Sequence, residues 1–296
     1  MSEVLSILMS VKNESEYITE ALDSIEKTDI SKDISVEVVI VDDGSNDNTC
    51  EIIRSRNQQN IKLIESGGVG KANAYSLAYK HSIGDYFILF AGDDTLISDM
   101  MIERVSPLIG KKEVPSVTFA KMLSFSNNKK YDNILLPKNP NHGMRSGSGI
   151  CFNKAFAKLV FPIPSVLPNE DSWIMHFPEY FDVSVFEVPK VCMRYRIHEN
   201  NSYKRGVDFS SVKYQQWIRA RSSLIFYTSY FNKLDKECEK KLLLKIVLDI
   251  FKYLGNSVNL LFLGSVPLKD RLKALFNSSS VMYHIREFAY SFFSGR

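Results

Sequence analysis

Apolar runs of strand length alternate with amphipathic segments through the first third of the chain. The strand-like runs are residues 4–11, 36–41, 61–65 and 86–91. The intervening segments with helical spacing are residues 18–25, 48–56 and 71–81. Asn13, with Glu16 three residues later, is expected to cap the first of these helices. Strands that alternate with helices predict an α/β fold whose doubly wound, mostly parallel sheet is covered on both faces.

The pattern changes after the first hundred residues. Residues 116–136 are mixed and strand-rich, a loop at 144–151 leads into a helix that Asn153 caps, and two further strands are expected at 183–188 and 192–197. Beyond residue 209 only helices are expected. This helical part carries 14 Lys or Arg against 6 Asp or Glu, whereas residues 1–208 carry 23 against 28. The net charges of +8 and −5 predict a catalytic domain at 1–208 and a basic helical extension at 209–296.

Composition narrows the class of protein. The chain is 45% hydrophobic and 24% charged, which is ordinary for a soluble globular protein. Its four cysteines are too scattered for a local zinc or redox motif and suggest a reducing compartment. The first residues lack a basic region, and no apolar run reaches about eighteen residues, so neither a cleaved signal peptide nor a spanning helix is expected. We therefore expect a cytoplasmic protein with no nucleic-acid partner.

Paired carboxylates follow two of the predicted strands, as Asp42-Asp43 and Asp93-Asp94. Ligands of open α/β sheets bind beyond the carboxyl ends of the strands. A carboxylate pair after a buried strand is costly unless it faces water, a cation or a ligand. An Asp-Gly turn or a helix cap would also explain the first pair, and an exposed acidic turn would explain the second.

Three further positions carry candidate chemistry. Three glycines of residues 67–70 precede Lys71 at a helix start, where free N–H groups and a cation suit a diphosphate, although a flexible turn with a solvated lysine is an equal alternative. Asp171 begins an apolar segment, so it is a candidate general base or simply a residue that stabilises the helix dipole. His198 follows the last predicted strand and is either a metal ligand or structural. The absence of GxGxxG after the first strand disfavours a dinucleotide-binding fold.

These motifs, taken in order, resemble those of the family 2 glycosyltransferases with the GT-A fold. The segments that carry the resemblance are SILMSVKNESEYI (6–18), VVIVDDGSNDNT (38–49), GGVGKANAYSLAY (67–79), GDYFILFAGDD (84–94), NED (169–171) and YRIHENNS (195–202). They are spread over roughly the first two thirds of the chain. Ala91 stands where many members have a first Asp, and Lys12 stands where many have an aromatic residue.

The resemblance implies a role for each matching position. Ser10, Lys12, Asp43, Lys71 and Asp93 would bind the nucleotide-sugar donor, with Asp43 on the base and Asp93 on the ribose. Asp94 and His198 would hold Mn²⁺ or Mg²⁺, although the missing Asp at position 91 leaves open which of Asp93 and Asp94 takes the metal. Asp171 would deprotonate the acceptor hydroxyl.

The implied function is inverting, metal-dependent transfer from a nucleotide sugar, with a lean toward UDP-sugars, to a saccharide or lipid-linked saccharide acceptor in surface polysaccharide synthesis. Two other interpretations stay open. Ala91 would suit a catalytically inactive nucleotide-sugar-binding partner subunit. Asp93-Asp94 with Asp99 imitates an acidic motif of haloacid-dehalogenase-like phosphatases, but the first strand lacks the DxD nucleophile pair that such an enzyme needs.

The extension has the pattern of a helix that lies on a membrane surface. Residues 242–263 are rich in large apolar side chains, and Lys245, Asp249 and Lys252 share one helical face. Residues 268–276 repeat the basic amphipathic pattern, and the last aromatic residues are Phe288, Tyr290, Phe292 and Phe293. The charge of +8 suits the anionic inner face of the cell membrane. Packing on the catalytic domain or an oligomer interface would produce the same stripes.

Overall fold

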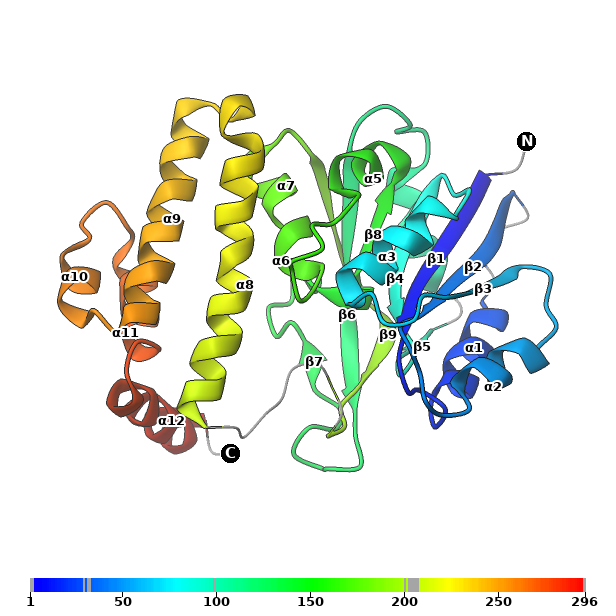
Figure 1. Cartoon of the computed structure of the whole chain (residues 1–296), viewed down its shortest axis with the longest axis horizontal. Coiled ribbons are helices and arrows are strands. Elements are labelled where there is room, and N and C mark those ends of the chain that lie inside the picture. The colour runs from blue at the N-terminus through cyan, green and yellow to red at the C-terminus, as the bar shows by residue number, and fades with distance from the viewer. Residues whose placement is uncertain are drawn as a thin grey trace. The chain divides into compact units, whose positions relative to one another are not determined.

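The computed structural model describes residues 3–28, 30, 33–97, 100–199, 201 and 208–294, and the side chains of Glu287 and of residues 289–294 are outside the description. The predicted positions Asp99, Tyr290, Phe292 and Phe293 thus lie outside the described residues or side chains. The chain divides into two compact units, Met1–Asn201 and Ser202–Arg296 (Figure 1). Each unit is described separately below.

The first unit is built on a sheet that has nine strands in the described part of the chain. Their order is β3-β2-β1-β4-β8-β6-β9-β5, and β7 pairs with β6. The first half is parallel and consists of β3 (Ile61–Glu65), β2 (Ile34–Asp42), β1 (Glu3–Val11) and β4 (Tyr86–Ala91). Its connecting helices are α1 (Ile18–Glu26), α2 (Thr49–Ser55) and α3 (Lys71–Lys80). The predicted strands and helices of the first third are confirmed.

The second half of the sheet is mixed. Its strands are β5 (Thr95–Leu96), β6 (Ser116–Phe125), β7 (Leu135–Leu136), β8 (Ile150–Asn153) and β9 (Ser184–Arg196). Strand β8 runs antiparallel between β4 and β6, while β6 and β9 are parallel over ten residue pairs with two register shifts. The two strands predicted at 183–188 and 192–197 form the single strand β9, because the bulges let one strand pass Pro189.

Burial follows from the position of each strand. β1 lies between two parallel neighbours, so Ile7, Leu8 and Met9 have no exposed surface. The short helices of the second half are α4 (Met101–Val105), η2 (Ser106–Leu108), η3 (Gly147–Gly149), α5 (Lys154–Val160), α6 (Asp171–Ile174) and α7 (His176–Tyr180). Asn153 caps α5 as predicted, since its side chain accepts from Phe156 N.

The prediction for the first helix cap is wrong. Helix α1 begins at Ile18 and has no side-chain cap. Asn13 instead lies in a loop with a φ of 57°, where its side chain accepts a hydrogen bond from Asn46 N at 2.8 Å. Asn13, which the sequence pattern predicted as a helix cap, therefore makes a contact between two loops.

The second unit is helical in its described part. It contains α8 (Phe209–Tyr230), η4 (Phe231–Lys233), α9 (Lys236–Leu254), α10 (Ser257–Phe262), α11 (Leu268–Phe276) and α12 (Ser280–Ser294). Asp208 and Asp235 cap α8 and α9, and Gly255 ends α9 in the left-handed conformation. Trp217 of α8 stacks on Tyr253 of α9, with ring centroids 4.5 Å apart. The helices within the described ranges are all too short or too polar to cross a membrane.

Candidate active site

The carboxyl ends of β1, β2 and β4 meet at one rim of the sheet. In register, Ser10 lies opposite both Val41 and Ala91, so the loops that follow these strands begin side by side. Ser10 is half-buried at this rim, and the next residue but one, Lys12, is exposed. The rim is where the sequence predicted the donor-binding residues.

The two residues of the first acidic pair, Asp42 and Asp43, make different contacts. Asp42 accepts hydrogen bonds from the N–H groups of Gly44 and Ser45, at 3.1 and 3.0 Å, and so shapes the turn. Asp43 accepts from Gly70 N at 2.9 Å. Asp43 thus joins the end of β2 to the glycine loop before α3, and both lie at the predicted nucleotide pocket.

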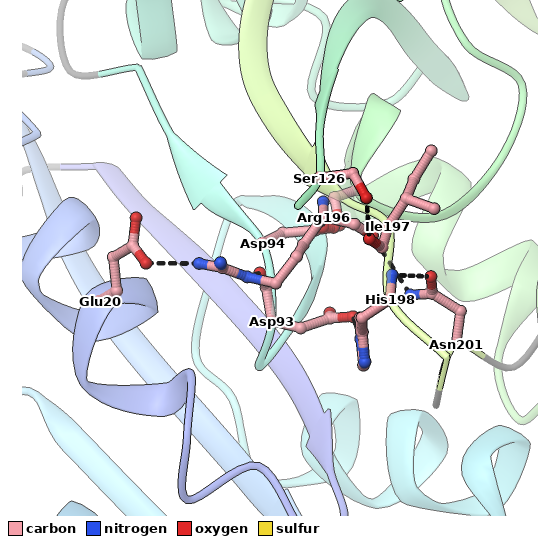
Figure 2. Close-up of polar contacts among 9 residues, drawn as sticks. Glu20, Asp93, Asp94, Ser126, Arg196, Ile197, His198 and Asn201 are labelled. Carbon is pink, nitrogen blue, oxygen red and sulfur yellow. Dashed lines mark hydrogen bonds and ion pairs between the residues drawn. The ribbon is translucent and has the colours of Figure 1, made fainter. Parts of the chain in front are cut away.

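The second acidic pair is held by the end of β9 and the segment after it. Asp93 Oδ2 lies 2.8 Å from His198 Nε2 and 3.2 Å from Asn201 Nδ2 (Figure 2). Asp94 is only 2% exposed and accepts from Arg196 N and Ser148 Oγ, at 3.0 and 2.8 Å. Burial, and then the charge of Asp93, raises the pKa of Asp94 well above its usual range.

Arg196 contacts the Asp93-Asp94 segment and three neighbouring side chains. Its Nε donates to Asp93 O at 2.9 Å, and its guanidinium also forms an ion pair with Glu20 of α1 (Figure 2). The guanidinium lies over the rings of Tyr17 and Phe125, at 4.5 and 4.3 Å from their centroids. Arg196 therefore supports the acidic loop through contacts with the protein itself.

Lys71 follows the glycine loop, as expected for a residue that binds a diphosphate, but its side chain contacts a carboxylate of the protein. Its Nζ lies 3.2 Å from Glu170 Oε1, and Glu170 has no exposed surface. Burial alone would lower the pKa of Lys71, but the charge of Glu170 outweighs it, and the pKa is raised. Lys71 is thus a permanent cation whose first partner is Glu170, a residue to which the sequence analysis gave no role.

Asp171, the predicted base, is the first residue of α6. Its Oδ1 accepts from Gly147 N at 2.6 Å, and its side chain is partly exposed. Asp171 is therefore open to a ligand on one side and held by the η3 turn on the other.

Glu14 is a site residue that sequence reasoning missed. It lies in the loop after β1, and its Cγ would be 3.0 Å from a Cβ placed on Gly92. Burial, Asp93 and Asp47, in that order, raise the pKa of Glu14 to about 8. The signal that could have found it is its position beside Asn13 at the end of a buried strand.

A buried tyrosine lies near both Asp94 and the Glu170-Asp171 pair. Tyr75 of α3 is buried and donates to Phe90 O at 3.2 Å. Its pKa is raised by burial, with Glu170, Asp171 and Asp94 adding to the effect. Tyr75 is thus within electrostatic reach of Asp94 and of the Glu170-Asp171 pair.

The residues present fit a metal ion that is coordinated partly by protein side chains and partly by a bound ligand. Among the described residues, no three His, Cys, Asp or Glu side chains form a metal site by themselves. Mg²⁺ is typically held by one or two carboxylates together with substrate phosphates. Asp93 and His198 converge, and His198 Nδ1 is buried without a hydrogen-bond partner in the described part of the chain. Asp94 is less exposed, and each of its oxygens already accepts a hydrogen bond.

Comparison with known proteins settles the family. The family model described as glycosyl transferase family 2 matches residues 6–161, more than half of the chain. The chain belongs to glycosyl transferase family 2. The matched region contains the rim residues, both acidic pairs, Lys71 and the η3 turn.

Individual relatives are similar over part of their length. The poly(ribitol-phosphate) β-N-acetylglucosaminyltransferase TarS of Staphylococcus aureus is 36% identical over 109 residues, which are 35% of this chain and 18% of TarS. This chain thus spans well under two thirds of that relative.

Two solved structures share the fold. The structure of S. aureus TarS 1-349 in complex with UDP-GlcNAc has a TM-score of 0.60 at 18% identity, covering 95% of this chain and 83% of that one. The mannosyltransferase PcManGT from Pyrobaculum calidifontis, in complex with GDP-Man and Mn²⁺, has a TM-score of 0.60 at 16% identity, covering 98% and 80%. The predicted GT-A fold is confirmed.

Proposed function

We propose that this family 2 glycosyltransferase moves a sugar, with inversion, from a UDP-sugar to a saccharide or lipid-linked saccharide of a surface polymer. The observation that carries the proposal is the convergence of Asp93-Asp94 with His198 at the rim where β1, β2 and β4 end. UDP-GlcNAc is the first donor to test because the TarS structure contains it and TarS is named a β-N-acetylglucosaminyltransferase. A β-linked product from an α-linked donor requires inversion.

The donor would lie across the rim. Asp43 would accept from the base, Ser10 and Lys12 would line the pocket, and Asp93 would lie near the ribose and diphosphate. A bound Mn²⁺ or Mg²⁺ would neutralise the leaving diphosphate. We assign the metal to Asp93 and His198, because Asp94 is engaged by Ser148 and Arg196; PcManGT, in complex with Mn²⁺, supports metal use. Lys71 would add positive charge behind the diphosphate.

Asp171 would accept the proton of the acceptor hydroxyl. It is partly exposed, and one of its oxygens is oriented by Gly147 N. One base on the acceptor side, opposite a single leaving group, gives a one-step displacement.

The test is donor binding followed by turnover. Calorimetry with UDP-GlcNAc and UDP, with and without Mn²⁺, measures affinity, and release of UDP in the presence of saccharide acceptors measures transfer. We expect Asp93→Asn to weaken metal-dependent binding, whereas Asp171→Asn should bind donor normally and lose turnover. Binding without turnover for any acceptor would instead favour the inactive partner subunit suggested by Ala91.

We further propose that the second unit attaches the enzyme to an anionic membrane surface. Large apolar side chains are exposed on its last three helices, at Val258, Leu261, Phe262, Leu268, Leu272, Val281, Ile285 and Phe288. Phe262 is 80% exposed. The same helices carry Lys269, Arg271, Lys273 and Arg286, and a basic amphipathic surface of this kind binds anionic lipid without crossing it.

Liposome flotation of the full chain tests this attachment. Binding should rise with the fraction of anionic lipid and fall with salt. Phe262→Ser should reduce binding, while Leu224→Ser on α8, which is also exposed, should not. Equal loss for both variants, or no binding at low salt, would point to packing or an oligomer interface.

A further inference from the structure

The η3 turn, Gly147–Gly149, contacts Asp171, the proposed base, and Asp94, the neighbour of the proposed metal ligand Asp93. Ser148 Oγ donates to Asp94 Oδ2 at 2.8 Å, and Gly147 N donates to Asp171 Oδ1 at 2.6 Å. Asp94 belongs to the donor side and Asp171 to the acceptor side. One turn of three residues therefore spans the two halves of the site.

The turn is closely packed at Gly149. Gly147 has a φ of 49°, and a Cβ on Gly149 would lie 2.8 Å from both Cβ and O of Met144. Met144 N is itself bonded to Ala120 O of β6 at 2.7 Å. The Gly149 end of the turn is therefore held against the sheet through Met144.

The buried side chain of Arg104 is hydrogen-bonded to the η3 turn. Arg104 of α4 has no exposed surface, and its Nη2 donates to Ser148 O at 2.7 Å. Its Nε and Nη1 have no hydrogen-bond partner among the described residues. A buried guanidinium with two unsatisfied nitrogens is unfavourable for stability. Among the described residues, the bond to Ser148 O is the one hydrogen bond of this guanidinium, and it is made to the η3 turn.

We infer that Arg104 is a positioning residue that, through Ser148 of the η3 turn, sets the separation between Asp94 and Asp171. The inference rests on the proposed function, because that function places Asp93, next to Asp94, at the donor and Asp171 at the acceptor. Displacements of about 1 Å in such a geometry cost on the order of 100-fold in rate. Arg104 touches no reacting group and acts through the turn.

Arg104→Met distinguishes positioning from a merely structural role. Met fills similar space and removes the unsatisfied nitrogens, so the melting temperature should stay the same or rise. The kcat should nevertheless fall at least tenfold, with the KM of each substrate changed less than threefold. Lys121→Met is the matched control, because Lys121 is a buried cation bonded to the carbonyls of Pro137 and Asn139 instead. It should leave kcat unchanged.

A second readout does not depend on activity. Deuterium exchange of the peptide 143–150 should accelerate in Arg104→Met and stay at the wild-type rate in Lys121→Met, while β1 stays protected in both. Ser148→Ala should weaken donor binding, and Ser148→Thr should restore it. Unchanged exchange in Arg104→Met overturns the inference, as does faster exchange with wild-type kcat. If the wild type transfers no sugar, the proposed function fails, and exchange alone then decides whether Arg104 holds the turn.

Discussion

Removal of the Lys71 side chain is the sharpest test of how the glycine loop is built. At 3.2 Å from Glu170, the ion pair is worth about 5 kcal/mol at an effective dielectric constant of about 20. Solvent reaches 32% of the Lys71 side chain, which weakens the attraction, whereas Glu170 is wholly buried. Loss of one partner of a buried pair costs about 3–5 kcal/mol. We therefore expect Lys71→Met to lower the free energy of unfolding by about 3 kcal/mol.

The loss of unfolding free energy should differ between variants of Lys71 and variants of Glu170. Lys71→Met leaves a buried carboxylate without its cation, whereas Glu170→Gln leaves a lysine that can turn toward solvent. We expect about 1 kcal/mol for Glu170→Gln, and a double variant, Lys71→Met with Glu170→Leu, closer to wild type than Lys71→Met alone.

Thermal unfolding followed by circular dichroism measures these effects. For a domain of this size each kcal/mol shifts Tm by about 2–4 °C, so Lys71→Met should melt about 6–12 °C lower. Titration with UDP-GlcNAc in the same samples reports donor affinity. If Lys71→Met melts like the wild type and only binds donor more weakly, the reasoning from the ion pair is refuted, and the lysine serves the diphosphate alone.

Three further outcomes are expected. The raised pKa of Glu14, about 8, means that its protonated form is favoured in the folded state. The stability that this gives is full below about pH 4.5 and is lost as pH rises through 8. Measured by denaturant unfolding in chelator, the free energy of unfolding of Glu14→Gln should match wild type at pH 4 and exceed it at pH 9, and equal stability at both would contradict the shift. Asn153→Ala removes a cap and bonds to Ser116 N, Lys111 O and Val114 O, so urea unfolding should show a loss of about 2–3 kcal/mol. Asp43→Ala should reduce donor affinity and speed exchange at Gly70, whose N–H it accepts; unchanged exchange would leave only a ligand-binding role.

The sequence predicted the parallel half of the fold well because burial on both faces makes its strands continuous apolar runs. It also placed Asp43, Asp93 and Asp94 at the rim, since the carboxyl ends of parallel strands share one edge. The antiparallel strand β8 was not predicted, because four residues that follow a glycine turn have too short a pattern to assign.

The supporting contacts could not be predicted for a different reason. Arg104 and Ser148 lie in segments without a motif, and Glu14 lies in a motif that gave it no role. The roles of all three depend on which distant loops come together. Ser148 and Asp94 are 54 positions apart in the chain. Lys71 shows the same limit: its place at a helix start was predicted, but its ion pair with the buried Glu170 arises from tertiary packing.

The position of Arg196 has a consequence for synthesis of the protein. The strands β1 to β4 can pair once about ninety residues have left the ribosome, and N-terminal elements generally fold first. Their acidic loop, however, is bonded to Arg196, more than a hundred positions later. Nascent chains that end before β9 would therefore hold a formed half-sheet whose acidic loop lacks its Arg196 contacts. Completion of this loop is thus a late event, which waits until about two thirds of the chain has been synthesised.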